Sequence, residues 1–342
     1  MIRVAVIGHF GIGLNLANGQ TIKTKIITEE VEKHCEEKAM IIDTHGGIKA
    51  VLPVVFGCIK ALKKSKNIII MLTENGLKVC IPILYFFNKI FKRRLHYVVV
   101  GGWLPDFLIA NPKFINELKS FYRIYVETNN MKKWLNDMDL DNVVVMPNCK
   151  PLKILKKPYI CTKPYKLCTF SRVMKEKGIE EAVKAVTLAN KQLGMDFFHL
   201  DIYGQIDVKQ KEWFDKLKNS FPIYIKYCGV VNFDKSVETL KSYFALLFPT
   251  YYEGEGFAGT AIDAFSAGIP VLASNWKYND EVIKEGINGG LVEPKNVNEM
   301  VSRLIDMERN PDNWLKMREQ CIVDAHKYEP DNVMKILLDE LI

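Results

Sequence analysis

The strongest constraint on the fold of this chain is a regular alternation of short apolar runs, rich in β-branched residues, with segments of helical periodicity. In the first half the apolar runs lie at 2–8, 39–44, 67–72, 95–102, 123–127 and 143–147. Segments with helical spacing separate most of them, at about 19–38, 50–64, 75–91 and 130–136. Apolar strands that alternate with helices are typical of a parallel sheet covered on both faces. We therefore predict a doubly wound α/β domain.

The same alternation begins again after a break at 149–166 that is rich in lysine and proline. The later apolar runs lie at 166–172, 197–204, 223–229, 244–250 and 270–274. A chain of 342 residues is also longer than one core usually organises. We predict an N-terminal Rossmann-like domain over 1–155, a C-terminal one over 156–328, and a last helix over 329–342 that returns to the N-terminal domain.

The formal net charge of +7 is concentrated in the first half of the chain. Residues 1–155 contain 22 Lys and Arg against 13 Asp and Glu, a balance of +9, which leaves −2 for the remainder. This asymmetry indicates an anionic partner for the N-terminal half, either a phospholipid surface or a phosphate-bearing acceptor. A lysine-rich solvated surface without a partner is the alternative. The basic residues lack an interleaved aromatic motif, which argues against nucleic acid.

The eight cysteines are scattered without a C-x-x-C pair, so the sequence signals neither a structural zinc site nor a redox motif. The first residues, MIRVAVIG, run directly into a strand pattern without the segments of a signal peptide. No apolar run in the sequence approaches the length of about twenty residues that a membrane span needs. These features favour a cytoplasmic protein, with peripheral contact at the inner face of the cell membrane as a further expectation.

The first candidate site lies in PTYYEGEGFAGTAIDAFSAGIPVLAS (249–274), where a strand passes through an acidic loop into a helix. Ligands of open α/β sheets bind at this carboxyl edge. Glu255 stands in the loop, and Asp263, eight residues later, lies about two turns into the helix on nearly the same face. Free N–H groups around 257–260 suit phosphate or sugar oxygens. Helix capping with one solvated acid is the alternative interpretation.

The second candidate site is FSRVMKEKGIEEAVKAV (170–186), in which a strand runs out into Arg172 and Lys177 precedes an amphipathic helix. Arg172 offers a forked contact to a diphosphate, and Lys177 offers a point charge. Ordinary surface cations are the alternative interpretation.

Together these segments resemble the retaining glycosyltransferases of family 4, which have the GT-B fold and include enzymes of bacterial cell-surface polysaccharide synthesis. The matching blocks occur in order: SRVMKEKG (171–178), DIYG (201–204), YCGVV (227–231), EGFAGTAIDA (255–264) and AGIPVLAS (267–274). In the N-terminal half the resemblance rests on IGHFGIGLNLANGQTIKTK (7–25) and MPNCKP (146–151). It implies two Rossmann-like domains whose parallel sheets face each other across a cleft.

The resemblance also implies roles for single residues. Arg172 and Lys177 would contact the donor's phosphates, Glu255 would meet the transferred sugar as the catalytic residue, and Asp263 would hold the nucleotide ribose. Further donor contacts are implied at Gly13, Val230, Gly256, Phe257, Ala258, Gly259 and Thr260. Two of these residues depart from the family pattern, since Asp263 replaces the usual second glutamate and Ala258 a glycine. No cofactor and no metal ion is expected, because the two cations can offset the charge of the leaving diphosphate.

Acceptor contacts are expected from the N-terminal half. The glycine-rich loop at 8–20, with Asn18 and Gly19, lets the backbone approach a ligand closely. Many members of the family carry a histidine after a later strand of this half, where the present chain has a pair of glycines followed by Trp103 and Asp106. Trp103 then becomes a candidate for stacking on a sugar face, with Asp106 beside it; an ordinary buried tryptophan is the alternative.

The segment 79–96 is apolar nearly all round and ends in Lys92, Arg93 and Arg94. A helix of this kind, if exposed, can enter the headgroup region of a bilayer. A core helix with a basic last turn explains the pattern equally well.

We therefore expect a glycosyltransferase that moves a sugar, with retention of configuration, from a nucleotide-sugar donor to a saccharide or lipid-linked acceptor in surface polysaccharide synthesis. Two alternatives stay open: a nucleotide-sugar epimerase on the same fold, and a non-catalytic donor-binding partner protein. The first glycine-rich loop is not a G-x-G-x-x-G fingerprint, which disfavours a dehydrogenase.

Overall fold

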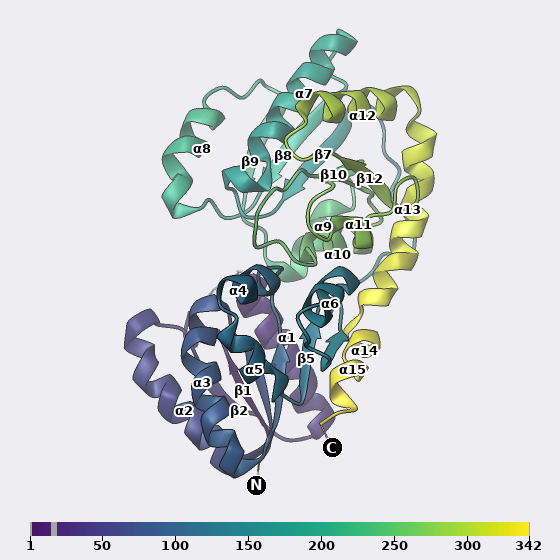
Figure 1. Cartoon of the computed structure of the whole chain (residues 1–342). Helices are drawn as coiled ribbons and strands as arrows, with labels where there is room; N and C mark the ends of the chain where they lie inside the picture. The colour runs from purple at the N-terminus through teal and green to yellow at the C-terminus, as the bar shows by residue number, and fades with distance from the viewer. Residues whose placement is uncertain (1, 15–18, 342) are drawn as a thin grey trace. The chain divides into compact units, whose positions relative to one another are not determined.

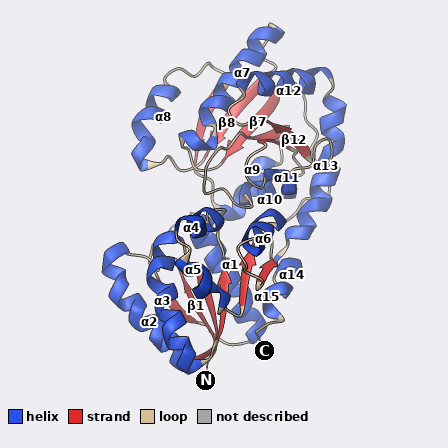
Figure 2. Ribbon diagram, viewed as in Figure 1, coloured by secondary structure: helices blue, strands red, loops and turns tan. Residues whose placement is uncertain are grey.

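The computed structural model describes residues 2–14 and 19–341, which fold into two compact α/β units (Figure 1). Unit 1 comprises residues 1–151 together with 330–342, and unit 2 comprises 152–329. Each unit contains one six-stranded parallel sheet, with helices on both sides of the strands (Figure 2). The prediction of two doubly wound Rossmann-like folds is confirmed.

Unit 1 runs β2-β1-β3-β4-β5-β6 across its sheet, so the chain reverses its direction across the sheet between β1 and β3. Its strands are β1 (Ile2–Gly8), β2 (Met40–Asp43), β3 (Ser65–Met71), β4 (Arg94–Val98), β5 (Arg123–Val126) and β6 (Val143–Val145). Its helices are α1 (Gly19–Cys35), η1 (Gly47–Ala50), α2 (Val51–Lys64), α3 (Glu74–Phe91), α4 (Leu104–Ala110), α5 (Lys113–Lys119), α6 (Asn129–Asn136), α14 (Pro330–Val333) and α15 (Lys335–Leu338).

The helices of unit 1 cover both faces of its sheet, as right-handed crossover connections require. Because α1 connects β1 to β2 and the later crossovers run the opposite way, α1 covers one face and α2 and α3 cover the other. The helices α2, α3 and α5 pack in a row. The end of the chain was expected as one helix over 329–342 but forms two short helices, α14 and α15. The distance from Lys33 Nζ of α1 to Asp331 Oδ1 of α14 is 3.9 Å.

Helix α3 settles the interpretation of the apolar segment at 79–96. Its Leu77, Cys80, Ile81 and Leu84 are buried, as a core helix requires, and Phe86 on the opposite side is exposed. Among the helices of residues 2–14 and 19–341, none is long and apolar enough to cross a membrane.

Unit 2 has the strand order β12-β11-β10-β7-β8-β9, the doubly wound order in which the chain reverses between its first and fourth strands, here β7 and β10. Its strands are β7 (Tyr165–Phe170), β8 (Phe198–Tyr203), β9 (Ile225–Gly229), β10 (Ala245–Phe248), β11 (Val271–Ser274) and β12 (Gly289–Val292). Its helices are η2 (Lys175–Lys177), α7 (Ile179–Leu193), η3 (Val208–Gln210), α8 (Lys211–Lys218), η4 (Phe233–Lys235), α9 (Ser236–Leu240), α10 (Gly259–Ser266), α11 (Asn279–Val282), α12 (Val297–Arg309), α13 (Pro311–Ala325) and η5 (His326–Tyr328).

Two apolar clusters hold unit 2 together, one on each face of the sheet. Helices α7 and α12 pack together and supply the first cluster with residues such as Val186 and Leu304. Helices α9, α10 and α13 supply the second, which includes Phe265 and Cys321. Strands β7 and β10 are thus covered by apolar side chains on both faces of the sheet.

Candidate functional site

The point where the chain reverses its direction across the sheet of unit 2 gathers the residues that the sequence singled out. Strands β7 and β10 are neighbours, and their connections leave in opposite directions. Such a switch point leaves a crevice at the carboxyl ends of the two strands, where α/β proteins bind ligands. Arg172 and Lys177 follow β7, and Glu255 follows β10.

The backbone brings the two loops into direct contact at Gly178. This residue has a φ of +71°, and a Cβ added to it would lie 2.1 Å from the carbonyl oxygen of Pro249. Only glycine permits both the conformation and the close approach. Tyr251 N–H donates to the carbonyl oxygen of Glu176 at 2.8 Å, which joins the loops a second time. Lys177 is therefore held against the end of β10.

Lys177 and Glu255 form a largely buried ion pair. The distance from Lys177 Nζ to Glu255 Oε2 is 2.5 Å, and the two side chains are 11% and 9% exposed. The hydroxyl of Thr250 donates to the same carboxylate oxygen at 2.7 Å. A buried carboxylate needs such partners, because its loss of water is otherwise costly. The structure thus brings together two of the four residues on which the sequence interpretation depends.

Arg172 lies beside this pair. Its guanidinium is 5.8 Å from the centre of the Tyr252 ring, and Lys177 Nζ is 5.0 Å from the same ring. Arg172 is about half exposed and lies 3.7 Å from the carboxylate of Asp207, a separation at which an exposed pair contributes little. Two cations therefore flank one tyrosine ring, and the guanidinium is accessible to an anionic ligand.

The helix that carries Asp263 begins at Gly259, after Ala258 in an extended conformation. Its first turn is tied to β7, because the Thr260 hydroxyl donates to the carbonyl oxygen of Phe170 at 2.6 Å. Asp263 is buried, one turn further along. Helix α10 therefore starts beside the end of the strand that leads to Arg172.

The remaining predicted donor residues of unit 2 lie in two places. Gly256 and Phe257 are buried in the loop before α10, and the Phe257 ring packs edge-on against Tyr328 at 4.9 Å. Val230 follows β9, the strand at the edge of the sheet, and is exposed. The order β7-β8-β9 places Val230 two strands from β7.

In unit 1 the predicted residues follow the carboxyl ends of two strands, β1 and β4. Gly13 lies in the loop after β1 with a φ of +81°, and Gly19 is the first residue of α1. Asn18 lies outside the described residues. Trp103 stands at the start of α4, with its indole N–H donating to the Val100 carbonyl oxygen at 2.9 Å, and Asp106 is exposed in the first turn.

A histidine pair occupies the same edge of unit 1. His45 Nδ1 and His9 Nε2 are 3.0 Å apart, and His9 Nδ1 is 2.7 Å from the Thr21 hydroxyl. Burial, followed by the neighbouring His45, lowers the pKa of His9. This pair follows β1 and β2, whereas the histidine of β4, His96, is fully buried and has a pKa lowered by burial to about 4.

Two charged residues at the carboxyl edge of the unit 1 sheet were not predicted from the sequence. Lys23 Nζ and Glu127 Oε1 form an ion pair at 2.5 Å, with side chains only 5% and 3% exposed. Lys23 belongs to α1 and Glu127 follows β5, so the pair joins positions 104 residues apart. Nothing in the local sequence pattern of either residue signals the contact.

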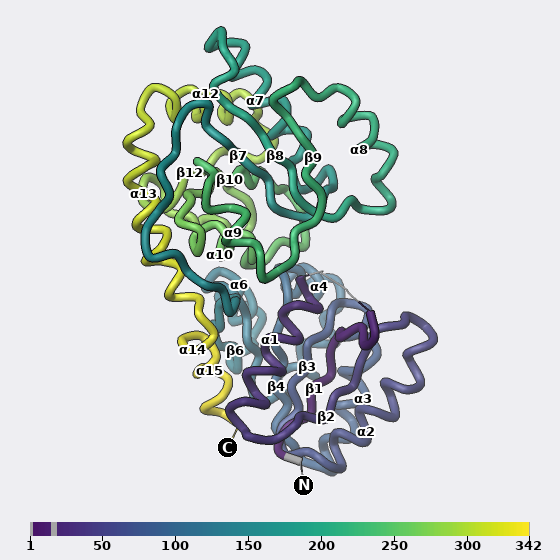
Figure 3. Tube along the Cα trace, turned by 180° about the vertical axis from the view of Figure 1, so that it is seen from behind, coloured from purple at the N-terminus to yellow at the C-terminus, as the bar shows by residue number. Residues whose placement is uncertain are grey.

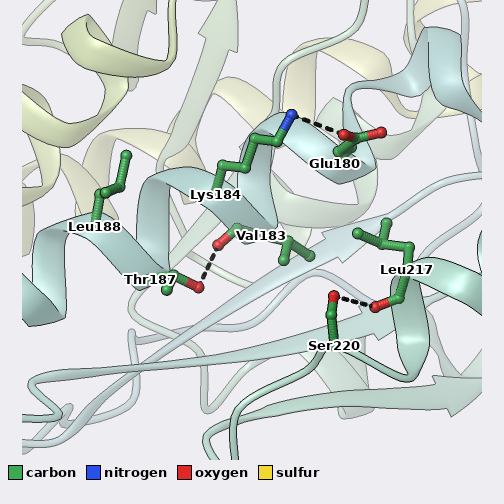
Figure 4. Close-up of a pocket in the computed structure, with 7 residues that line it drawn as sticks. All are labelled: Glu180, Val183, Lys184, Thr187, Leu188, Leu217 and Ser220. Atoms are coloured by element: carbon green, nitrogen blue, oxygen red, sulfur yellow. Dashed lines mark hydrogen bonds and ion pairs between the residues drawn. The ribbon is translucent and has the colours of Figure 1, made fainter.

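A cavity of about 410 Å³ opens elsewhere on unit 2 (Figure 4). It is lined by α7 and the end of α8, with the ion pair of Lys184 and Glu180 at 2.7 Å on its wall. None of the predicted site residues lines it. Over the described residues, 2–14 and 19–341, no three His, Cys, Asp or Glu side chains gather as metal ligands would.

Thr250 is a residue of the site that sequence reasoning missed, and its hydroxyl invites a direct test. Thr250→Val keeps the shape but removes the hydrogen bond to Glu255, so we expect kcat of the sugar transfer expected from the sequence to fall about tenfold. Thr250→Ser keeps the hydroxyl and should retain most of the activity. Steady-state kinetics on both variants checks this, and equal activity of the valine and serine variants would contradict the role.

Comparisons with known proteins show that the C-terminal part of the chain matches a known protein family. The family described as glycosyl transferases group 1 matches residues 153–328. The chain is 25% identical over 232 residues to an uncharacterized glycosyltransferase of Methanocaldococcus jannaschii, across 66% of this chain and 54% of that protein. It is 30% identical over 162 residues to the GtfA subunit of the UDP-N-acetylglucosamine–peptide N-acetylglucosaminyltransferase of Streptococcus agalactiae, across 47% of this chain and 30% of that one. The chain thus spans about half or less of these two relatives.

Among solved structures, Anabaena HepE in complex with UDP and glucose is similar over the whole chain. The TM-score is 0.75 at 11% sequence identity, and the match covers 100% of this chain and 99% of that one. A likeness at this low identity shows the fold, and the fold is GT-B.

Proposed function

Because this chain belongs to the glycosyl transferases of group 1, we propose that it transfers a sugar from a nucleotide-sugar donor to a saccharide or lipid-linked acceptor. We further propose retention of the anomeric configuration, as in family 4, and a role in surface polysaccharide synthesis. The observation that carries the proposal is the buried pair of Lys177 and Glu255 beside Arg172, at the switch point of unit 2.

In this proposal the donor diphosphate lies against Arg172, Lys177 and the N–H groups that open α10. Without donor, Glu255 neutralises Lys177. When a phosphate takes the lysine as its partner, Glu255 loses that ion pair but keeps the hydrogen bond from Thr250. The carboxylate is then oriented toward the sugar that follows the phosphates, where it can accept a hydroxyl hydrogen bond or stabilise positive charge at the reacting carbon.

The leaving group of such a transfer is a nucleoside diphosphate, whose negative charge grows as the sugar-phosphate bond breaks. Two cations and the start of a helix in a partly dehydrated crevice stabilise that charge more than water does. We propose that they do so without a metal ion or cofactor, and that the leaving phosphate accepts the proton of the acceptor hydroxyl. Asp263 then holds the ribose, for which its shorter side chain suffices if the nucleotide lies close to α10.

We propose that the acceptor contacts four residues of unit 1: Trp103, Asp106, Asn18 and Gly19. The indole of Trp103 is partly exposed and fixed by its hydrogen bond to Val100, which suits it to stack on a sugar face. We place the enzyme in the cytoplasm, in agreement with its eight free thiols.

The experiment that tests this function is incubation of the full chain with labelled nucleotide sugars, with and without saccharide and lipid-linked acceptors. UDP-sugars come first, because HepE is described with UDP and the streptococcal relative is named for UDP-N-acetylglucosamine. We expect acceptor-dependent appearance of label in a larger product. Label that changes sugar without acceptor would identify an epimerase, and binding without turnover over a broad panel would identify a non-catalytic protein.

A further inference from the structure

One face of unit 1 carries apolar side chains that are exposed to solvent and do not pack in its core. These side chains belong to η1 and to the N-terminal half of α2, and the lysines of the C-terminal half of α2 continue the same side. Ile48 is 93% exposed, and Leu52 and Phe56 are each 69% exposed. Residues four apart lie on one side of a helix, so Leu52, Phe56 and Lys60 share one side. We call Ile48, Leu52, Phe56, Lys60 and Lys63 the α2 face.

The sequence around the α2 face is basic to an unusual degree. Residues 44–105 contain ten Lys and Arg and a single acid, Glu74. Glu74 is already paired with Lys78, at 2.6 Å. The lysines of the α2 face therefore stand in a segment that has almost no negative charge of its own to neutralise them.

The fold adds a second helix to this basic surface. Helix α3 lies beside α2, as the two views in Figures 1 and 3 show. The Nε of Arg93 donates to the carbonyl oxygen of Leu62 at 2.9 Å, which joins the end of α3 to the last turn of α2. The exposed Lys92 stands next to this contact, and the exposed Lys63 and Lys64 close α2.

We propose that the α2 face docks the protein on the surface of an anionic lipid bilayer. Apolar side chains on a surface helix gain by entering the boundary between headgroups and acyl chains, and nearby lysines gain by approaching anionic headgroups. Leu52 and Phe56 supply the first interaction, and Lys60 and Lys63 supply the second. The α3 segment, with its core-facing side chains, contributes its basic end and the exposed Phe86 and Ile90 rather than lying in the bilayer itself.

The positive charge around the α2 face favours an anionic bilayer over a second copy of the chain as the partner of this face. A symmetric dimer places the same patch of both copies face to face, so the basic segment would meet itself. An anionic bilayer instead offers many negative charges over the whole width of α2 and α3. This inference does not depend on the reaction proposed for unit 2, and it is tested separately from it.

Vesicle flotation of the full chain tests the proposal. The protein should float with vesicles of phosphatidylcholine and phosphatidylglycerol but not with phosphatidylcholine alone, and raised salt should weaken the binding. The double substitution Leu52→Gln with Phe56→Gln should lower partitioning about tenfold or more. The double substitution Lys60→Glu with Lys63→Glu should lower it by at least about the same factor.

Matched controls exist in unit 2. Val208→Gln with Ile223→Gln changes two apolar residues that are at least as exposed, and Lys191→Glu with Lys316→Glu reverses two exposed lysines; both variants should float like the wild type. Thermal melts confirm that each variant is folded. The proposal is overturned if the wild type fails to float with anionic vesicles, or if both α2-face variants float unchanged. It is also overturned if light scattering shows a dimer that Phe56→Gln dissociates, because a second copy would then cover this face.

Discussion

Replacing Glu255 by glutamine is expected to lower kcat/KM for sugar transfer by about a thousandfold or more. Glutamine has the shape of glutamate and can still accept the hydrogen bonds from Thr250 and Lys177. It lacks the negative charge that the proposed transition state requires. Because the substitution also removes the anion that competes for Lys177, the affinity for a nucleoside diphosphate should be equal to or higher than that of the wild type.

A loss of turnover with unchanged or tighter nucleotide binding would show that Glu255 acts in catalysis and not only in the structure of the site. The control is Glu253→Gln, the same chemical change two residues away, at a carboxylate that is largely exposed and pairs with Lys277 at 3.1 Å. That variant should keep wild-type turnover. Turnover by Glu255→Gln close to that of the wild type would remove Glu255 from the reaction, and loss of nucleotide binding together with turnover would show that the carboxylate organises the site without taking part in the chemistry.

The second large effect concerns stability. Gly178→Ala should lower the free energy of unfolding by about 3 kcal/mol or more, because alanine is strained at positive φ and its Cβ has no room. The carbonyl oxygen of Pro249 lies 2.1 Å from the position that this Cβ would take. Relief of the clash must separate the two loops and therefore Lys177 from Glu255. Denaturant unfolding followed by circular dichroism measures the loss.

Gly194 provides the matched control. It has a φ of +74°, similar to that of Gly178, but no atom lies within 4 Å of an added Cβ. Gly194→Ala should therefore cost only the backbone strain, about 1 kcal/mol. If the two alanine variants are equally stable, the close approach of Gly178 to Pro249 is not what holds the loops together.

The sequence predicted those parts of the fold that local pattern decides. Continuous apolar runs such as NIIIML at 67–72 and FALLFPT at 244–250 correspond to β3 and β10, because buried parallel strands are apolar on both faces. Helices α4 and α5 were missed, since they are short and carry little periodic signal. Strand β12, GGLV, escaped notice because two of its four residues are glycine, which is rare in strands.

The candidate site was predictable only in part. The order of Arg172, Lys177 and Glu255 along the chain, each just after an apolar run, places them at one edge of a sheet once the strands are parallel. The ion pair of Lys177 and Glu255 joins positions 78 residues apart, and no local pattern specifies such a contact. The role of Thr250 and the buried pair of Lys23 and Glu127 depend on the packed structure in the same way.

The central claim is that two cations of unit 2 receive the diphosphate of a nucleotide sugar. Calorimetric titration of UDP, GDP and ADP into the full chain tests it most directly, with Arg172→Ala and, as a control, Lys316→Ala. Arg172 is about half exposed, so its removal should leave the fold intact while it weakens the binding of one of these nucleotides about tenfold or more. If none of the three binds, or if Arg172→Ala binds as tightly as the wild type and the control, the claim is contradicted.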